Sequence, residues 1–251
     1  MPLTITPLPH IPLIQPGDDL AGMILSALEG AGLTLENGDI LVLAQKIVSK
    51  AEGRLVELAS VSPSPAALEL AAQTDKDPRL AELVLRESNV ILRTRPGSVI
   101  VEHRLGFVCA NAGIDQSNVR GDENWALLLP EDPDRSAAEI RARLEADSGK
   151  QLGVMIIDSH GRAWRIGTVG TTIGLSGIPG TVDLRGEPDL SGYTLKITVL
   201  GAADELAAAA SLMMGQAAEG TPVVHIRGFP YPLREGSLKE LLRPKEQDMF
   251  R

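Results

Sequence analysis

Two stretches of the chain bring together side chains of the kinds that bind metal ions and phosphate groups. In the first, residues 101–118, an apolar strand runs into the small-residue turn 110–113, and Asp115, Ser117 and Asn118 follow at once. Small residues let a ligand approach the backbone, and an aspartate supplies the oxygen ligand that hard cations prefer. The same residue types are common in ordinary turns, so this stretch is equally compatible with a binding site and with a turn.

The second stretch, residues 156–165, has the sequence IIDSHGRAWR. Asp158 closes an apolar strand, and Ser159 adds a hydroxyl group. Arg162 and Arg165 supply fixed positive charges that suit phosphate or carboxylate groups, although a turn with solvated arginines is an equally good interpretation of this stretch alone. The aspartates of the two stretches together predict a site for one divalent cation, because magnesium binds through one or two carboxylates plus substrate phosphates.

Residues 214–221 (MGQAAEGT) connect a predicted helix to a predicted strand and offer further oxygen and backbone groups. Gln216 and Glu219 carry oxygen ligands, and Gly220 with Thr221 can present backbone to a phosphate. The competing interpretation is a helix C-terminus with Gly220 as its left-handed cap, and by itself the stretch favours that interpretation.

Residues 45–54 (QKIVSKAEGR) repeat positive charge beside a predicted buried strand, at Lys46, Lys50 and Arg54. Basic residues near a strand end are usually solvated, so this stretch indicates a phosphate site only in company with the others. The four histidines and the single Cys109 show no zinc-ligand spacing. The sequence has neither a GxxxxGK[ST] phosphate loop nor a GxSxG nucleophile motif.

Capping signals predict the helices that carry these stretches. The predicted helices begin after the side chains of Asp18, Ser64, Asp77, Ser136 and Ser237. Proline at the first helical position supports the second and third of them, and a glutamate three residues after the cap supports the last two. The first ends near Gly32 and the fourth near Ala146, and an alanine-rich helix spans Ala202–Ala218.

Apolar and β-branched runs predict strands at residues 39–49, 98–103, 105–110, 153–158, 194–200 and 222–227. The strands 98–103 and 105–110 are expected to pair. Residues 161–192 are rich in glycine and weakly periodic, which predicts turns and short strands. Because helices and strands do not strictly alternate, the sequence predicts an α+β fold with some α/β character, in which helices flank mixed sheets.

Bulk composition limits the function classes. The 251 residues carry a net charge of −9 and only 3% aromatic residues, which argues against general binding of nucleic acids or anionic membranes. The proline-rich start and the lack of a long apolar run argue against a leader or a membrane span. We therefore expect a cytoplasmic protein whose anionic ligands meet local cations or metal ions.

In combination, these stretches resemble the coenzyme F-420 gamma-glutamyl ligase family. The resemblance keeps order and spacing over roughly residues 8–228, nearly the whole chain. Its segments are HIPLIQPGDDL (10–20), QKIVSKAEGR (45–54), KDPRLAELVLRES (76–88), EHRLGFVCANAGIDQSN (102–118), LLPEDPD (128–134), residues 156–165, DLRGEPDL (183–190) and ADELAAAASLMMGQAAEGTPV (203–223). The resemblance implies an enzyme that adds L-glutamate to a deazaflavin precursor of the coenzyme, with cleavage of GTP.

The resemblance also implies a set of site residues. Asp115 and Asp158 correspond to ligands of a first divalent cation, magnesium or manganese. Ser159 and Gln216 correspond to ligands of a second one, and potassium is a further candidate cation. Nucleotide contacts are implied at Ile11, Pro12, Leu13, Ile14, Gln45, Lys46, Lys50, Asn118, Met214, Gly215, Gln216, Ala217, Ala218, Glu219, Gly220 and Thr221.

The implied mechanism follows from charge. The enzyme converts a terminal carboxylate of the precursor into an acyl-phosphate with the γ-phosphoryl group of GTP, and the glutamate amine then displaces phosphate. Because several anions meet in one site, cations must neutralise them, and Lys50, Arg162 and Arg165 are the candidate catalytic groups. The chain departs from the family where Ser159-His160 replaces a frequent Thr-Phe pair. Serine keeps the hydroxyl, and the role of His160 is open.

Two other functions use the same residues. A divalent-metal phosphohydrolase acting on a nucleotide or phosphorylated metabolite could employ the oxygens of Asp115, Asp158 and Gln216. A GTP-binding module without turnover is the third candidate, although two paired carboxylates exceed what binding alone requires.

The resemblance implies an intertwined homodimer with two interleaved subdomains in each chain. Residues 1–251 are then a single gamma-glutamyl ligase domain, without the C-terminal nitroreductase-like domain of some family members. The glycine-rich segment 161–192 supports a dimer, because it is too long to close a compact monomer core by itself.

Overall fold

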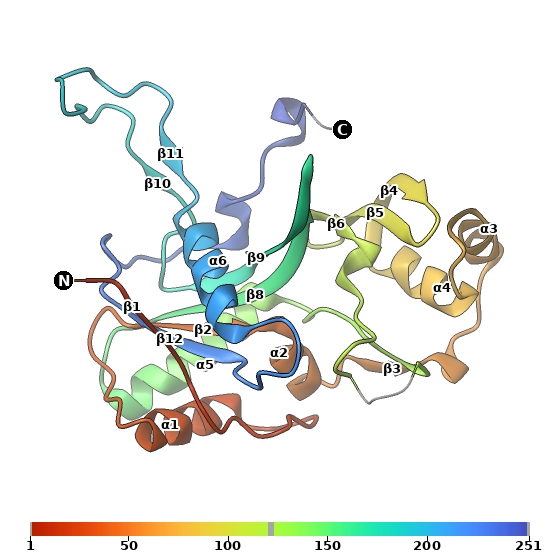
Figure 1. Ribbon diagram of the computed structural model, residues 1–251, viewed down its shortest axis with the longest axis horizontal. Coiled ribbons are helices and arrows are strands. Elements are labelled where there is room, and N and C mark those ends of the chain that lie inside the picture. The colour runs from red at the N-terminus through yellow and green to blue at the C-terminus, as the bar shows by residue number, and fades with distance from the viewer. Residues whose placement is uncertain (1, 120–122, 250–251) are drawn as a thin grey trace.

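A five-stranded mixed sheet forms the centre of the molecule (Figure 1). The computed structural model describes residues 2–119 and 123–249, and every predicted site residue lies in these ranges. The strands run in the order β1 (Thr4–Pro7), β12 (Val223–Arg227), β2 (Ile40–Ala44), β8 (Gly153–Arg162) and β9 (Arg165–Ser176). In this sheet β2 and β8 are parallel, and the other neighbours are antiparallel.

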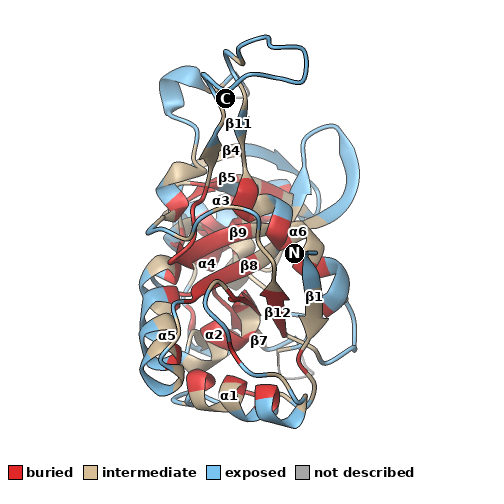
Figure 2. Ribbon diagram, turned by 90° about the vertical axis from the view of Figure 1, so that its left-hand side faces the viewer, coloured by how far each residue is buried: buried red, intermediate tan, exposed pale blue. Residues whose placement is uncertain are grey.

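Helices cover both faces of the sheet. The helices α1 (Leu20–Gly30) and α5 (Pro133–Ser148) lie on one face, and α6 (Ala202–Met214) lies on the other (Figure 1). Successive residues of β2 and β8 alternate between two hydrophobic cores, one on each side. This double burial, visible along β8 in Figure 2, explains why these strands are continuous apolar runs rather than alternating ones.

A second group of elements packs beside the end of β8. It contains β4 (Ser88–Arg95), β5 (Ser98–His103), β6 (Val108–Ala110), α3 (Pro65–Thr74) and α4 (Pro78–Arg86). The antiparallel pairing of β5 with β6 confirms the predicted hairpin. Both proline-first helices are also confirmed, because the side chains of Ser64 and Asp77 accept hydrogen bonds from the first turns of α3 and α4.

Short elements complete the structure. The strands β3 (Leu55–Glu57) and β7 (Trp125–Leu127) pair with each other, as do β10 (Val182–Asp183) and β11 (Val199–Leu200). Single 3₁₀ turns are found at η1 (Leu58–Ser60), η2 (Asn111–Gly113), η3 (Leu238–Glu240) and η4 (Lys245–Gln247). The mixed sheets with flanking helices confirm the predicted α+β class. None of the helices in the described ranges has both the length and the apolar character needed to cross a bilayer.

The prediction of one long strand over residues 39–49 is wrong. The strand β2 ends at Ala44, and Gln45–Ala51 forms the helix α2. The β-branched pair at 47 and 48 suggested a strand, but these two side chains face the core from a helix, and the polar side chain of Gln45 is buried beside them. The two lysines of this segment therefore extend from a helix that directly follows a central strand.

Three predicted helix caps are also wrong. Ser237 precedes only the 3₁₀ turn η3, and its side chain makes no capping hydrogen bond. The helix α1 is capped by Asp19, whereas Asp18 accepts a hydrogen bond from the backbone of Gln15. The helix α5 begins at Pro133 with Asp132 as its cap, so the same aspartate-proline signal operates here as in α4. Ser136 lies inside the first turn, where its hydroxyl donates to Glu52.

The prediction of turns and short strands for the glycine-rich segment is wrong over its first half. The twelve-residue strand β9 forms a long hairpin with β8. Its glycines allow helices to approach from both sides: a Cβ at Gly170 would lie 2.3 Å from the carbonyl oxygen of Ala207 in α6. A Cβ at Gly174 would lie 2.4 Å from Pro133 in α5. Glycine here marks close packing rather than a turn.

The segment after β9 leaves the body of the molecule as an extended arm, drawn at the upper left in Figure 1. The predicted strand 194–200 is reduced to β11, which pairs with β10 at the base of the arm. The predicted helix 202–218 ends at Met214, because Gly215 adopts φ 73 and stops it. The residues 215–222 are thereby released as a loop before β12.

Candidate active site

Four segments that are far apart in the sequence meet at one edge of the central sheet. Because β2 and β8 are parallel, Ala44 and Ile157 are neighbours near their carboxyl ends, with α2 following one strand and Asp158 continuing the other. The antiparallel β12 begins at the same edge, where the backbone of Ala44 donates to the carbonyl of Pro222 at 2.8 Å. The loop 215–222 and the helix α2 are therefore brought beside Asp158.

The turn that delivers Asp115 to this edge is strained. Asn111 and Ala112 have positive φ angles of 53° and 54°, a region that alanine rarely adopts. The Asn111 side chain supports the turn by accepting a hydrogen bond from the backbone of Val99 at 3.0 Å. Asp115 itself is fixed by two backbone hydrogen bonds with Leu127 of β7. Strain that the surroundings hold in place is typical of functional sites.

The Asp115 carboxylate is held by two residues of α2. Gln45 donates its amide to Asp115 Oδ2 at 2.7 Å, and the ammonium of Lys46 lies 3.3 Å from Oδ1. The pKa of Asp115 is raised to about 6, with burial as the largest cause; the charge of Asp158 also raises the pKa, and Lys46 lowers it. The fold thus keeps a carboxylate in a place where its negative charge is unfavourable without further cations.

Asp158 lies in β8, and its carboxylate is close enough to Asp115 for its charge to act there. Its side chain is 13% exposed, and its Oδ2 is 3.1 Å from Nε2 of His160. Burial raises the pKa of the Cys109 thiol to about 12, and the charge of Asp158 adds to that rise as it does for Asp115. The two carboxylates are therefore electrostatic neighbours across the contact between β8 and β6.

Ser159 and Gln216 meet beside this pair. The Ser159 hydroxyl donates to Gln216 Oε1 at 2.8 Å, and the amide nitrogen of Gln216 donates to the Ser211 hydroxyl of α6 at 2.9 Å. The loop can fold here because residue 215 is glycine: a Cβ on Gly215 would lie 2.2 Å from the Glu219 side chain. Glu219 in turn accepts a hydrogen bond from the backbone of Ala217.

Two lysines line the opposite side. The ammonium of Lys46 donates to the carbonyl and hydroxyl oxygens of Ser117 at 3.1 and 3.2 Å. The ammonium of Lys50 donates to the carbonyl of Asn118 at 2.8 Å, and the Asn118 side chain donates to the carbonyl of Ala217 at 2.9 Å. Burial lowers the pKa of Lys50, and the charge of Lys46 lowers it further. These contacts join α2, the 115–118 segment and the 215–222 loop into one site.

The segment 11–14 runs along the same edge. Its two flanks are anchored at opposite ends, because Leu8 donates to the carbonyl of Val223 at 2.9 Å and Gly17 donates to that of Ala51 at 2.8 Å. The chain between these points spans from the start of β12 to the end of α2. Ile14 is buried, whereas Leu13 is 87% exposed.

Comparison with known proteins shows which family the chain belongs to. The model of the F420-0:gamma-glutamyl ligase family matches residues 9–228, a range that contains all four segments of the site. This chain belongs to that family. A protein of Methanothermobacter thermautotrophicus, named coenzyme F420:L-glutamate ligase, is 51% identical over 243 residues and covers 96% of both chains. Proteins with the same name from Methanopyrus kandleri and Archaeoglobus fulgidus are 48% and 42% identical, over 99% and 100% of this chain and 98% and 97% of their own.

The donor set of this gamma-glutamyl ligase family member fits divalent cations. Its oxygen donors form two pairs at adjacent positions of β8, namely the Asp115 and Asp158 carboxylates and the Ser159 hydroxyl with the amide carbonyl of Gln216. All four groups offer oxygen, which suits magnesium or manganese rather than zinc or copper. Within the described ranges no three His, Cys, Asp or Glu side chains cluster as a metal site, so a cation here relies on two carboxylates and neutral oxygens.

Arg162 and Arg165 lie away from these groups. They pair with each other near the tip of the β8–β9 hairpin and are exposed. The side chain of Arg162 reaches the carbonyl of Ile166 at 3.5 Å. At about 3.3 Å per residue, Arg162 is roughly 13 Å along β8 from Asp158. Within one chain the structure does not bring either arginine to the carboxylates, and their catalytic role stays a prediction.

Gln45 and Ser211 have roles in the site that the sequence did not reveal. Gln45 was expected as a nucleotide contact, but it is buried between the Ser49 hydroxyl, which donates to it at 2.9 Å, and the Asp115 carboxylate. Ser211 fixes Gln216 from inside α6. In a helix, residues four apart are neighbours, so the spacing of Gln45 and Ser49 could have indicated their hydrogen bond. The prediction of a strand over these residues excluded that interpretation.

Proposed function

We propose that this protein joins L-glutamate to a deazaflavin precursor of coenzyme F420, with cleavage of GTP and formation of an amide bond. The observation that carries the proposal is the pair of neighbouring carboxylates, Asp115 and Asp158, with Lys46 and Lys50 beside them at one sheet edge. The printed name of the full-length relatives, coenzyme F420:L-glutamate ligase, supports the same activity.

The reaction requires activation of a poor electrophile. A carboxylate oxygen of the precursor attacks the γ-phosphorus of GTP, forming an acyl-phosphate and releasing GDP. The amine of L-glutamate then attacks the acyl carbon, the bond to the phosphate oxygen breaks, and phosphate leaves as the new nitrogen loses its proton. Divalent cations, when bound, supply charge neutralisation at the phosphate oxygens during the first step.

The residues of the chain have separable tasks in this scheme. Asp115 and Asp158 would hold one cation, and Ser159 with Gln216 would hold a second. Lys50 would donate to phosphate oxygens, and its support is that its half-buried ammonium donates to the backbone carbonyl of Asn118. The 214–221 loop and the segment 11–14 border the same space and would contact the nucleotide.

The test is an incubation of the purified chain with precursor, L-glutamate, GTP and magnesium or manganese, read by product mass and GDP release. We expect GDP release that depends on glutamate and a product heavier by one or more glutamyl units. Phosphate release from GTP without glutamate would instead support the phosphohydrolase function. Nucleotide binding without any turnover would support a GTP-binding module.

We also propose that the protein is a homodimer. The arm between β10 and β11 exposes several large apolar side chains, namely Leu190, Tyr193 and Ile197, and the hairpin tip exposes Trp164 and Ile166. Apolar groups on an extension that projects from the body of the molecule (Figure 1) are typical of surfaces that a second subunit covers.

A further inference from the structure

His160 lies beside one of the two site carboxylates, and the residues proposed for nucleotide and cation binding do not include it. Asp158 and His160 are alternate residues of β8, so their side chains leave the strand on the same face. The Ser159 side chain between them leaves on the other face, where it meets Gln216. The period of the strand therefore brings the imidazole of His160 to the Asp158 carboxylate.

The imidazole donates a hydrogen bond to this carboxylate. Nε2 of His160 is 3.1 Å from Oδ2 of Asp158, and because an ionised carboxylate only accepts, the ring nitrogen supplies the proton of the contact. Within the described ranges, His160 is the one residue that hydrogen-bonds the Asp158 side chain. An ionised carboxylate has about four acceptor positions, so the others stay open to a cation. The contact orients Asp158 and leaves it able to act as a ligand.

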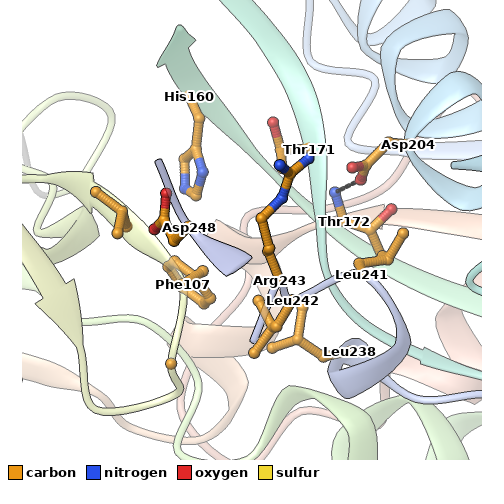
Figure 3. Close-up of a pocket in the computed structure, with 12 residues that line it drawn as sticks. Phe107, His160, Thr171, Thr172, Asp204, Leu238, Leu241, Leu242, Arg243 and Asp248 are labelled. Atoms are coloured by element: carbon orange, nitrogen blue, oxygen red, sulfur yellow. Dashed lines mark hydrogen bonds between the residues drawn. The ribbon is translucent and has the colours of Figure 1, made fainter. Parts of the chain in front are cut away.

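An aromatic neighbour supports the His160 ring. The side chain of His160 is 10% exposed, and its ring centroid is 5.4 Å from that of Phe107, toward which it is directed in Figure 3. Phe107 in turn stacks on His103, with ring centroids 5.1 Å apart. His103 is fully buried, and its Nδ1 accepts a hydrogen bond from the backbone of Leu105 at 3.1 Å. Three rings in succession therefore connect the buried end of β5 to Asp158.

The other carboxylate of the site is supported in a similar way. Gln45 donates to Asp115 at 2.7 Å, and the buried Ser49 donates to Gln45 at 2.9 Å. Each carboxylate thus receives a hydrogen bond from a side chain that a further group holds in place. Carboxylates that bind metal ions are commonly oriented by such outer partners.

We propose that His160 is a positioning residue for the divalent cation: it holds the Asp158 carboxylate in the orientation in which that carboxylate binds the ion together with Asp115. The inference rests on the proposed cation site and assigns to it a residue outside the ligand set. A carboxylate that is already fixed loses less conformational freedom when the cation binds. The contribution of His160 is therefore to cation affinity, and the chemical step at saturating cation does not depend on it.

The first test is His160→Phe, which keeps an aromatic ring against Phe107 and removes the donor. His160 borders a cavity of about 230 Å³, so the slightly larger ring has room. We expect the dissociation constant for Mn²⁺ to rise about ten- to a hundredfold, the usual effect of removing a residue that orients a metal ligand. Electron paramagnetic resonance of free Mn²⁺, at one fixed pH and without nucleotide, measures it. His10→Phe, at an exposed histidine outside the carboxylate pair, is the matched control and should bind Mn²⁺ like the wild type.

The second test is His160→Gln, whose side-chain amide offers an N–H donor at a reach similar to that of Nε2. We expect this variant to bind Mn²⁺ nearly as tightly as the wild type, which would identify the hydrogen bond, rather than ring packing, as the cause. Equal losses of affinity in the phenylalanine and glutamine variants would attribute the effect to packing and overturn the inference. Thermal melts of the cation-free proteins check folding, and His160→Leu is a second variant without a donor in case the first does not fold.

GDP release separates positioning from catalysis. His160→Phe should need a higher Mn²⁺ concentration for half-maximal GDP release, and saturating Mn²⁺ should restore the wild-type kcat. A kcat that stays low at saturating Mn²⁺ would contradict a role in cation affinity alone. If the wild type is active with Mn²⁺ and the variant has the same Mn²⁺ dependence, this inference alone is wrong. A wild-type protein that neither binds Mn²⁺ nor requires a divalent cation for turnover would refute the proposed cation site together with it.

Discussion

At the residue scale, Asp115 is a carboxylate whose charged form is destabilised by the folded structure. Its pKa of about 6 lies above the ordinary value of 3.8, with burial as the largest cause. The unfolded chain therefore releases the proton first as the pH rises. The charged carboxyl costs the fold stability above pH about 6 and costs nothing below pH about 4, a difference of roughly 2–3 kcal/mol.

Asp115→Asn should consequently raise the melting temperature of the cation-free protein at pH about 8 and leave it nearly unchanged at pH about 4.5. The same variant should lose metal-dependent GTP cleavage, because a neutral amide is a weaker ligand for a hard cation. Thermal melts of both proteins with a chelator, at both pH values, check the first half. A variant that melts earlier at pH 8 yet turns over normally would identify Asp115 as a structural turn residue.

Lys50 is the second residue whose contribution can be measured alone. Its ammonium is half-buried and touches the carbonyl of Asn118, so a phosphate oxygen can replace that contact without movement of the helix. We expect Lys50→Ala to lower kcat about a hundredfold with a smaller effect on KM for GTP, since charge builds up in the transition state. Lys150→Ala, at the opposite end of β8, is the control. Steady-state kinetics with unaltered kcat would remove Lys50 from the site.

At the scale of elements, the β8–β9 hairpin depends on glycines that admit two helices. Gly170→Ala should destabilise the protein by about 1–3 kcal/mol, because the new methyl group overlaps the carbonyl of Ala207 in α6. Gly161→Ala in the same hairpin is the matched control, since its Cβ would meet no atom within 4 Å. Urea titration of both variants measures the difference. Equal midpoints would show that α6 can move aside at no cost.

Glu87, directly after α4, connects three segments through its contacts with Arg54, which follows α2, and with His103 and Arg104 at the end of β5. Burial alone would raise its pKa, but His103, 3.7 Å away, and the two guanidinium groups of Arg104 and Arg54, each donating to Glu87 Oε2 at 2.9 Å, lower the pKa to about 2. The folded state therefore gains stability from the ionised carboxylate at pH above about 4.5 and loses it as the pH falls toward 2. We expect Glu87→Gln to lower the free energy of unfolding by about 3 kcal/mol at pH 7 and by less near pH 3. Denaturant titrations across that range test it, and a pH-independent loss would point to packing instead.

The extent to which the sequence predicted this architecture can be judged from particular elements. Proline-first helices and doubly buried strands carry local signals, so α3, α4, β8 and β12 were predicted well. The helix α2 was not, because its buried polar residue has a partner 70 positions away, a contact that no local pattern encodes. Likewise, the glycines of β9 make sense only with α5 and α6 packed on them.

At the scale of the whole molecule, the exposed apolar residues of the arm between β10 and β11 predict that two chains form a dimer. Light scattering at micromolar concentration should give twice the chain mass of 26.7 kDa. Replacing Leu190 and Ile197 with aspartate should lower that value toward the monomer, because two charged groups would have to be buried without partners. Lys150→Ala should stay dimeric. A stable monomer for the wild-type chain would contradict the homodimer proposal.

The order of the strands also constrains how the chain can be made. β12 lies between β1 and β2, so the first strand has no neighbour in the sheet until one near the end of the chain is synthesised. Roughly 200 residues separate the two, which at 5–20 residues per second leaves β1 unpaired for about 10–40 s on the ribosome. The loop that delivers Gln216 emerges with β12, so the nascent chain closes its sheet and completes the proposed cation site in the same late event.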